Sequence, residues 1–492
     1  MFKDATPSDI NQAMEQAWEA FHVYRTMSLK QRAGFMRRIA FEIEALGDAL
    51  LETTGRETNL PEARLRNERA RTMFQLTSYA DACEKGDWLE ARIDTALPDR
   101  NPPRPDIRKM LVPIGPVVVF GAANFPFAYS TAGGDTASAF AAGCPVIVKA
   151  HPAHPATSEM MASAILKAAE ACAMPKGIFT HLHGVSFEVG RSLVEHPFTK
   201  AVGFTGSYTG GRQLADWAAQ RKEPIPVFAE MSSINPVYLM PGKMKMAAAE
   251  TAKAYAGSIT LGVGQFCTNP GLLIGIDNAD LQIFINTLGE EISKVNPAAM
   301  LHAGIYKNYL EKKEVSLGQP GVDLVAAAPA AAEGQGDAVV ASVSAADFIE
   351  NPLLHQEVFG PFSLVIRCKD MDEMLAVTRH LEGQLTATLM ATDEDITGNP
   401  LLTEAVKDIC GRFILNGVPT GVEVCLSMQH GGPFPSSTDA RFGSVGADAM
   451  KRFARPLSFQ NWPDPLLPDE LKNANPLGIW RTVNNEPGRQ SC

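Results

Sequence analysis

From about residue 110 onward, short apolar runs rich in β-branched residues alternate with segments of helical composition. The runs read LVPIGPVVVFGA, CPVIVKAH, GIFTHLHG and AVGFTGS, and a helix-like stretch, TSEMMASAILKAAEAC, separates the second run from the third. Short runs that are apolar throughout are typical of strands buried on both faces of a parallel sheet and joined by crossover helices. The sequence therefore predicts an α/β fold built on a doubly wound sheet.

A second set of apolar runs follows in the C-terminal half: GLLIGID, PFSLVIRC, LTATLMAT and GRFILNG. These runs predict a second α/β domain, and we expect the boundary between Glu230 and Pro241. The predicted division is a Rossmann-like domain in residues 1–230, a second domain in 231–455 and a strap in 456–492. The segment 326–338 is small-residue rich and low in complexity, which predicts a surface loop.

Two helices are expected before the first sheet. Ser28 and Gln31 have the spacing of a capping box, a signature of a helix N-terminus. Apolar residues then recur at helical spacing, namely Phe35, Met36, Ile39, Ile43, Leu46 and Leu50. This pattern predicts one amphipathic helix that opens the fold, and a second helix is expected from about residue 61 to 84.

Composition excludes several classes of protein. The net charge of the 492 residues is -11, without a long basic run, so nucleic acid and membrane surfaces are disfavoured as partners. The N-terminus does not have the pattern of a secretory leader, and no apolar stretch reaches membrane-spanning length, so we expect a cytoplasmic protein. Eight scattered cysteines without a CxxC pair predict reduced thiols, with neither a disulfide framework nor a metal site.

Cys267 is the cysteine with the most unusual setting. The sequence contains no G-x-G-x-x-G after a strand, no P-loop and no G-x-S-x-G elbow, so simple nucleotide-binding, kinase and serine hydrolase interpretations are weakened. Cys267 lies in GSITLGVGQFCTNPG, where glycines allow backbone N–H groups to approach and favour a nucleophilic thiolate. Taken alone, any one of the cysteines is more commonly a buried, inert thiol.

Six short segments occur in an order and spacing that resemble the aldehyde dehydrogenase superfamily over nearly the whole chain. They are GAANFPFA, CPVIVKAHP, GFTGS, FAEM, GQFCT and EVFGPF. Three further features resemble one branch of that superfamily, which holds α-ketoglutaric semialdehyde dehydrogenases and an NADP-linked fatty aldehyde dehydrogenase. These features are VKAHPAHP, EMSS in place of the usual E-L-G-G, and CLSMQHGGPFPSST. The resemblance implies an aldehyde dehydrogenase fold: a Rossmann-like cofactor domain, an α/β catalytic domain and a small oligomerisation element.

The resemblance also implies catalytic roles. Cys267 matches the family nucleophile, and Asn124 matches the side-chain donor of its oxyanion hole. Glu230 matches the general base, whose pKa we expect partial desolvation to raise. His430 corresponds to a histidine of the fatty aldehyde member that could tune the thiolate. The alternatives are a turn-forming asparagine, a surface carboxylate and a loop histidine bonded to backbone.

Five residues match cofactor-binding positions of the family. Lys149 corresponds to the residue that holds the adenosine ribose, Gly206 and Ser207 to the diphosphate turn, and Glu357, with Phe359 nearby, to the residue that holds the nicotinamide ribose. The alternatives are a lysine that reaches solvent and a loop carboxylate.

The resemblance favours NADP over NAD. NAD-preferring family members commonly have a glutamate three positions after the lysine, and this chain has Pro152 there. At position 152 the 2′-phosphate of NADP then meets no carboxylate that would repel it. His151 and His154 could assist the binding of that phosphate. NAD remains possible.

The implied reaction is oxidation of an aldehyde to a carboxylic acid through a cysteine thioester, with α-ketoglutaric semialdehyde as the leading substrate. Arg441 is available to bind a distal carboxylate. The alternatives are a medium- or long-chain fatty aldehyde, a coenzyme A-acylating reaction, which Glu230 argues against, and a non-catalytic binding protein. The run NANPLGIWRTVNNE resembles the family's oligomerisation tail, which implies a homodimer or homotetramer.

Overall fold

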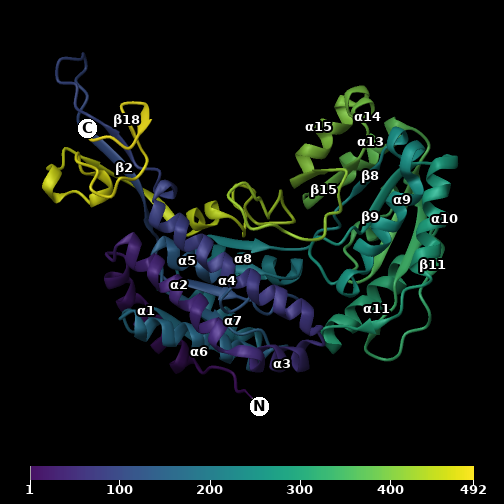
Figure 1. The fold of residues 1–492 in the computed structure, drawn as a ribbon, viewed down its shortest axis with the longest axis horizontal. Helices are drawn as coiled ribbons and strands as arrows, with labels where there is room; N and C mark the ends of the chain where they lie inside the picture. The colour runs from purple at the N-terminus through teal and green to yellow at the C-terminus, as the bar shows by residue number, and fades with distance from the viewer. Residues whose placement is uncertain (1) are drawn as a thin grey trace.

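The computed structural model describes residues 2–492, which form two α/β units and a smaller sheet that projects from the first unit (Figure 1). The first unit is a five-stranded parallel sheet in the order β5-β4-β3-β6-β7. Its strands are β3 (Val117–Phe120), β4 (Val146–Lys149), β5 (Phe179–Leu182), β6 (Ala201–Thr205) and β7 (Val227–Glu230). Its helices are α1 (Pro7–Tyr24), α2 (Leu29–Ala45), α3 (Gly47–Thr58), α4 (Glu62–Lys85), α5 (Gly134–Ala142), α6 (Pro155–Ala171), α7 (Phe187–Glu195) and α8 (Tyr208–Gln220).

The strand order of this sheet reverses between β3 and β6, which are neighbours. In doubly wound sheets, ligands bind at such a switch point, beyond the carboxyl ends of the strands. The strands are buried because helices cover both faces, as the continuous apolar runs predict. This edge of the sheet is therefore where a site is expected.

The N-terminal helices correct one sequence prediction. The capping box of Ser28 and Gln31 is present and begins α2, but α1 precedes it, so α2 does not open the fold. The predicted helix also ends earlier than expected, because Gly47 adopts a left-handed φ of 61° and Leu50 belongs to α3. The helix expected from residue 61 to 84 is confirmed as α4.

The run LVPIGPVVVFGA is two strands of different sheets. β2 (Ile107–Pro113) is antiparallel in the projecting sheet, whereas β3 lies in the centre of the first sheet. The break falls at Gly115, where φ is 132° and an added Cβ would lie 2.6 Å from the side chain of Lys200. Apolar content does not distinguish one strand from two, so the sequence did not show this break.

The second unit is a seven-stranded sheet in the order β11-β13-β14-β9-β8-β15-β16, parallel except for the pair β11 and β13. Its strands are β8 (Val237–Leu239), β9 (Leu272–Ile276), β11 (Asp323–Ala327), β13 (Val339–Ser344), β14 (Phe362–Cys368), β15 (Gln384–Met390) and β16 (Cys410–Leu415). Its helices are α9 (Pro241–Thr260), α10 (Ala279–Ile292), α11 (Ala303–Leu317), α12 (Ala345–Glu350), α13 (Met371–His380), α14 (Asp393–Gly398) and α15 (Pro400–Ile409).

The loop expected in residues 326–338 is shorter in the structure. Residues 326–327 complete β11, and β12 (Gln335–Gly336) pairs with β10 (Ala298–Ala299). Ala332 and Glu333, which lie between β11 and β12, are exposed, the first without regular structure and the second in a turn, as predicted for the whole segment. Backbone pairing explains the difference, because alanine-rich composition does not prevent a strand from adding to a sheet edge.

A third sheet has the order β17-β2-β1-β18-β19, with β1 (Arg92–Asp94), β17 (Ala454–Gln460), β18 (Arg481–Val483) and β19 (Glu486–Gly488). Before β17, the chain crosses from the second unit over the first (Figure 1), where Met450 and Phe453 join the core. The expected stretches 1–230, 231–455 and 456–492 thus do not each correspond to one sheet, and their division by role stays a prediction. In this chain, β18 of the predicted oligomerisation tail pairs with its own β1.

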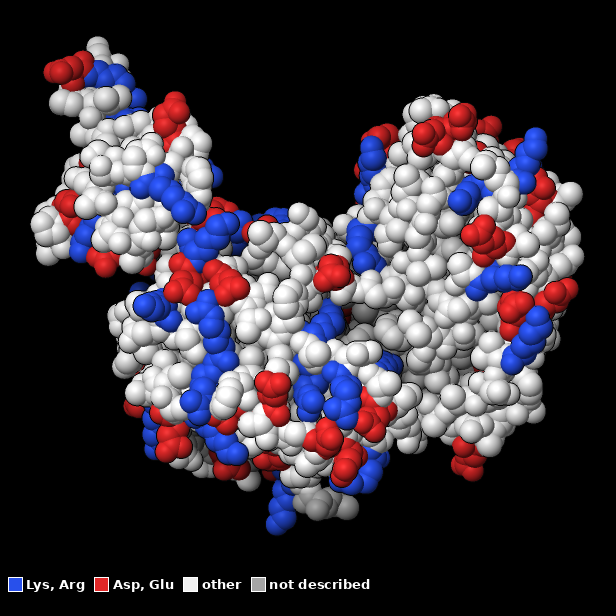
Figure 2. Space-filling model, in the orientation of Figure 1, with Lys and Arg blue, Asp and Glu red and all other residues white. Residues whose placement is uncertain are grey.

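The outer surface carries charges of both signs. Figure 2 shows Lys and Arg interspersed with Asp and Glu on one face, and a hollow between the two α/β units. No helix within residues 2–492 is both long enough and apolar enough to span a bilayer.

Candidate active site

The predicted residues of the first unit follow its parallel strands at one edge. Lys149 ends β4, Glu230 ends β7, and Gly206 and Ser207 come directly after β6. Asn124 lies in the turn that follows β3. Because all five strands are parallel, their carboxyl ends meet at the same edge, where the topology predicts a ligand site.

The second unit contributes residues that precede its strands. Cys267 lies in the loop before β9, and Glu357 and Phe359 lie in the loop before β14, the strand next to β9. The two loops touch, since an added Cβ on Gly264 would lie 2.3 Å from the backbone carbon of Gly360. Only a glycine at position 264 permits this approach.

The loop that carries Cys267 has an unusual backbone. Gly262, Val263 and Gly264 all adopt left-handed φ angles, 56°, 58° and 64°. This conformation is strained for a β-branched residue such as Val263, and strain of this kind is concentrated at functional sites. Asn235 holds this loop in place, because its Nδ2 donates to the backbone carbonyl oxygens of Cys267 and Asn269, each at 2.9 Å.

His430 lies between the predicted nucleophile and the predicted base. Its Nε2 is 3.5 Å from Sγ of Cys267 and 3.0 Å from Oε1 of Glu230. One ligand-type atom from each of the three side chains lies within 4.8 Å of the others. Glu230 Oε2 accepts a 2.6 Å hydrogen bond from Ser444 Oγ, so both of its oxygens have a polar neighbour.

The predicted pKa of Glu230 is wrong in direction. Burial opposes the charged carboxylate, as expected, but His430 and the hydrogen bond from Ser444 outweigh it, and the pKa of Glu230 lies below its ordinary value. The thiol of Cys267 has a raised pKa, because burial is reinforced by the carboxylates of Glu230 and Glu357. The thiol is therefore the resting form, and its proton needs an acceptor before attack.

Asn124 lies beside the nucleophile loop. Its side-chain Nδ2 donates to the backbone carbonyl oxygen of Gln265 at 3.1 Å, and its backbone carbonyl oxygen accepts from Arg64 Nη2 at 2.7 Å. The amide donor is 8% exposed. Gln265 comes two residues before Cys267, so this hydrogen bond joins the Asn124 amide to the loop that carries Cys267.

Several polar residues around the nucleophile were not singled out by the sequence analysis. Tyr129 packs its ring 5.9 Å from that of His430, and Arg71 Nη2 donates to its hydroxyl at 3.1 Å. Ser444 and Arg412 also lie in this region. Arg441, the sequence candidate for carboxylate binding, instead forms a 2.6 Å ion pair with Asp439, and its side chain is 79% exposed.

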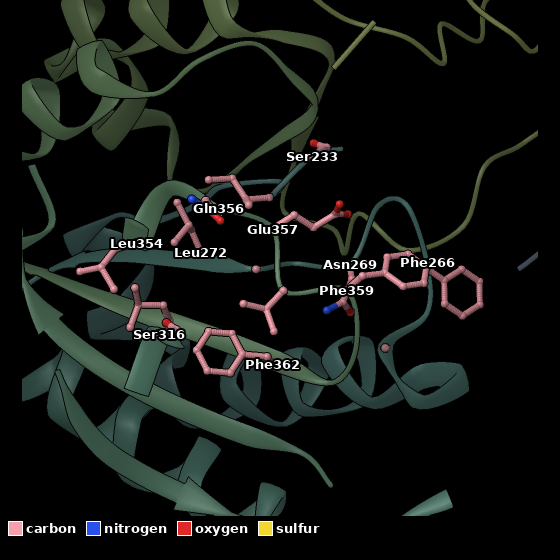
Figure 3. Close-up of a pocket in the computed structure, with 15 residues that line it drawn as sticks. Ser233, Phe266, Asn269, Leu272, Ser316, Leu354, Gln356, Glu357, Phe359 and Phe362 are labelled. Carbon is pink, nitrogen blue, oxygen red and sulfur yellow. The ribbon is translucent and has the colours of Figure 1, made fainter. Parts of the chain in front are cut away.

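A pocket with about 400 Å³ of empty space lies beside the nucleophile loop. Figure 3 shows Glu357, Phe359, Phe266 and Asn269 around it. Burial raises the pKa of Glu357 to about 7, against the opposing effects of Ser232 and Lys312. A partly buried carboxylate among apolar groups is suited to accept hydrogen bonds from ligand hydroxyls.

The residues of the first sheet that are predicted to bind the cofactor have partners of their own. Lys149 Nζ donates to the carbonyl oxygen of Gly184 at 3.1 Å, and burial lowers its pKa. Ser207 caps α8 by accepting from Gly210 N, and an added Cβ on Gly206 would lie 2.6 Å from Phe204. The N-terminus of α8 is thus the kind of site that binds phosphate.

The two histidines proposed to assist a phosphate differ in accessibility. His154 is fully buried, and its Nε2 lies 3.1 Å from the carbonyl oxygen of Ala122. This contact indicates a structural role for His154, and its ring is not accessible to a phosphate in solvent. The ring of His151 stacks on His154 at 5.3 Å, and burial lowers its pKa well below the ordinary value, so a charged His151 is disfavoured.

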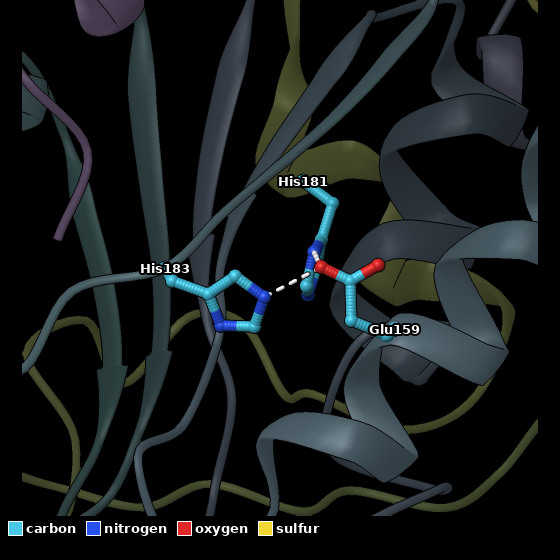
Figure 4. Close-up of side chains that lie close together, drawn as sticks. All are labelled: Glu159, His181 and His183. Carbon is cyan, nitrogen blue, oxygen red and sulfur yellow. Dashed lines mark hydrogen bonds and ion pairs between the residues drawn. The ribbon is translucent and has the colours of Figure 1, made fainter. Parts of the chain in front are cut away.

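A second cluster of ligand-type atoms lies on the first sheet. Oε1 of Glu159 is 2.5 Å from His183 Nε2 and 3.5 Å from His181 Nδ1 (Figure 4). The other nitrogen of His181 lies 2.7 Å from Ser158 Oγ. These contacts describe a hydrogen-bonded network, and the expectation that the chain binds no metal remains a prediction.

The site and fold agree with what similar proteins show. The sequence profile of the aldehyde dehydrogenase family matches residues 1–453. The chain therefore belongs to the aldehyde dehydrogenase family, and it is an oxidoreductase that acts on aldehydes. The resemblance drawn from the six segments is confirmed.

Two relatives match almost the whole chain. α-Ketoglutaric semialdehyde dehydrogenase 2 of Azospirillum brasilense is 48% identical over 98% of this chain and 92% of its own length. α-Ketoglutaric semialdehyde dehydrogenase of Acinetobacter baylyi is 44% identical over the same shares, 98% and 92%.

Solved structures confirm the predicted fold. A 1-pyrroline-5-carboxylate dehydrogenase from Thermus with bound NAD has a TM-score of 0.78 and 20% identity, with 93% of this chain and 86% of that chain covered. The R100A mutant of the Thermus thermophilus enzyme gives a TM-score of 0.79 over the same shares, 93% and 86%. At this identity the likeness concerns the fold alone.

Proposed function

We propose that this enzyme oxidises α-ketoglutaric semialdehyde to 2-oxoglutarate, with NADP as the hydride acceptor and a thioester on Cys267 as the intermediate. The observation that carries the mechanism is the convergence of Cys267, His430 and Glu230, whose ligand-type atoms lie within 4.8 Å of one another. The substrate is supported by the two relatives named for this activity, at 48% and 44% identity.

The first step is attack by sulfur. The Cys267 thiol gives its proton to Nε2 of His430, 3.5 Å away, and Sγ bonds to the aldehyde carbon as the carbonyl π pair moves to oxygen. Asn124 Nδ2 stabilises that oxyanion as a donor whose removal typically costs about 100- to 1,000-fold in rate. The product is a hemithioacetal held in one orientation.

The second step is oxidation and release. A nicotinamide cofactor held with Glu357 at its ribose would supply the hydride acceptor that converts the hemithioacetal to a thioester. Glu230 then takes a proton from water, and the hydroxide adds to the thioester carbonyl. The carbon–sulfur bond breaks, the sulfur regains a proton from the site, and the carboxylate leaves. A space of about 280 Å³ lined by Glu230, His430 and Ser444 gives water a place beside the base.

The cofactor assignment rests on residues of both units. Lys149, Gly206 and Ser207 lie at the edge where a dinucleotide would bind, and Glu357 lines the pocket of the second unit. Pro152 is exposed three positions after Lys149. Position 152 itself therefore offers no carboxylate to repel a 2′-phosphate, and the positive charge of Lys149 favours it.

The test is the initial rate of NADP reduction with α-ketoglutaric semialdehyde, compared with hexanal and decanal and repeated with NAD. We expect a strong preference for the semialdehyde and for NADP. Preference for the alkanals would replace this substrate with a fatty aldehyde and leave the shared chemistry. Absence of turnover with every aldehyde would favour a non-catalytic binding protein, and turnover only with added coenzyme A would favour an acylating enzyme.

We further propose that the enzyme works in the cytoplasm as a homodimer or homotetramer. The projecting sheet supports this proposal, because β19 and β17 are its outer strands, and an outer strand has backbone groups available for pairing. Light scattering coupled to size-exclusion chromatography measures the state directly. A monomer at micromolar concentration would contradict it.

A further inference from the structure

Three partly buried guanidinium groups lie around Tyr129 and the loop that carries Cys267. They belong to Arg64 and Arg71 on α4 and to Arg412 on β16. Within residues 2–492 none of them forms an ion pair, although each is largely shielded from solvent. The buried carboxylate of Glu68, also on α4, acts on Arg64 and Arg71, but it accepts its hydrogen bonds from the backbone N–H groups of Phe127 and Ala128 and not from either guanidinium.

Each of these side chains also keeps a buried N–H donor without an acceptor. The unpartnered nitrogens are Nε of Arg71, Nε of Arg412 and Nη1 of Arg64. A buried donor that is left unsatisfied costs about 1 to 3 kcal/mol, and a charged one costs more. Their number in one region indicates that the acceptor is supplied by a ligand.

Arg71 is the best placed of the three to bind that ligand. Arg64 already donates a hydrogen bond to the backbone carbonyl oxygen of Asn124. Its guanidinium carbon lies 5.2 Å and 4.8 Å from the ring centres of Phe125 and Phe266. Arg412 donates both terminal nitrogens to backbone carbonyls of the loop that follows β16. Arg71 forms one side-chain hydrogen bond, from Nη2 to Tyr129.

Two contacts place Arg71 at the substrate end of the site. Its guanidinium lies 5.2 Å from the centre of the Tyr129 ring, and that ring lies 5.9 Å from His430, the neighbour of the nucleophile. Arg71 and Arg412 both act electrostatically on Cys267, although they come from different units of the fold. Arg412 also acts on Tyr129, the residue that Arg71 contacts, so both positive charges lie in the neighbourhood of Tyr129.

We propose that Arg71 binds the carboxylate of a short ω-oxo acid substrate, and that Arg412 supplies a second positive charge in the neighbourhood of Tyr129. A planar guanidinium with free N–H groups matches a carboxylate in a bidentate pair. This assignment rests on the proposed function and replaces the sequence candidate, Arg441, which is already paired with Asp439. It makes Arg71 a specificity residue that contacts the substrate away from its reacting carbon.

The test compares two aldehydes that differ in the carboxylate alone, 5-oxopentanoate and pentanal, together with α-ketoglutaric semialdehyde. For Arg71→Met we expect kcat/KM to fall about 100-fold with both acids, mainly through KM, and to change less than about threefold with pentanal. Arg71→Lys should retain part of the preference for the acids, because lysine keeps the positive charge but cannot form the bidentate pair of a planar guanidinium. Arg441→Met is the matched control and should leave all three substrates unchanged.

The outcomes separate this inference from the proposed function. If the unaltered enzyme does not prefer the acids to pentanal, the proposed substrate is wrong. If it prefers them and Arg71→Met keeps the preference, the role of Arg71 is overturned while the function stands. An equal loss for all three aldehydes would show instead that Arg71 acts on the thiolate or on folding, and loss of the preference in Arg412→Met alone would transfer the role to Arg412.

Discussion

Nε2 of His430 lies 3.0 Å from Oε1 of Glu230, and both side chains are buried, 1% and 5% exposed. The same nitrogen lies 3.5 Å from Sγ of Cys267. One imidazole nitrogen thus contacts both the proposed nucleophile and the proposed base. While unprotonated it can accept the thiol proton, and once protonated it holds the carboxylate in its charged form.

Separate roles for Cys267 and Glu230 predict separate kinetic defects. Cys267→Ala should abolish both the first hydride transfer and steady turnover. Glu230→Gln should keep a burst of about one NADPH per site and slow later turnovers by about 100- to 10,000-fold, because only thioester hydrolysis needs the base. Rapid-mixing absorbance at 340 nm, roughly the NADPH band, separates the phases. Glu42→Gln, a buried carboxylate paired with Arg38, is the control, and equal loss of the burst in both active-site variants would contradict this division.

Removal of His430 should move the ionisation of Glu230. In His430→Gln, burial is no longer outweighed, so the pKa of the carboxyl rises. The base works only when charged, and the acidic limb of thioester hydrolysis should therefore shift to higher pH, with the loss of rate confined to the acidic side of the profile. Single-turnover hydrolysis measured across pH tests this shift, and Ser444→Ala should move the limb in the same direction by less. An unmoved limb would show that His430 does not set the charge of Glu230.

Glu357 should make stability depend on pH. Burial raises its folded-state pKa to about 7, above the roughly 4.3 of an unfolded glutamate. Between these values the folded state binds more protons than the unfolded state, so stability falls as pH rises. Relative to Glu357→Gln, the cofactor-free enzyme should lose as much as about 3 kcal/mol of unfolding free energy between pH 5 and pH 8. Urea unfolding of both proteins measures this difference, and parallel pH curves would contradict it.

Asn235 should support the nucleophile loop through its two donated hydrogen bonds. Asn235→Asp keeps the shape and tolerates the left-handed φ of 48° but removes the donors to the carbonyl oxygens of Cys267 and Asn269. We expect a loss of about 2 to 5 kcal/mol in stability together with a smaller burst rate. Asn475→Asp is a matched control, because Asn475 has the same φ of 48° and donates to two carbonyl oxygens in the C-terminal segment. It should lower stability by a similar amount and leave the burst unchanged, and a normal burst in Asn235→Asp would show that the loop does not depend on it.

Local sequence patterns predicted much of the fold. The run CPVIVKAH became β4 and the run GLLIGID became β9, because continuous apolar residues identify strands that are buried on both faces. The cap of α2 was also visible, since Ser28 and Gln31 interact within one turn. The patterns missed the break at Gly115 and the return of the chain to the first sheet, because apolar content does not record which sheet a strand joins.

The sequence by itself determined the family and pointed to the residues that we propose carry its chemistry, because Cys267, Glu230 and Asn124 lie in short motifs with fixed spacing. Only the tertiary structure decided how those residues meet. His430 is 163 positions from Cys267, and Ser444 is 214 positions from Glu230, yet both pairs are in contact. Their contacts lower the pKa of Glu230, where desolvation alone predicts a raised value. The direction of that pKa depends on neighbours that packing brings together, and no local pattern contains them.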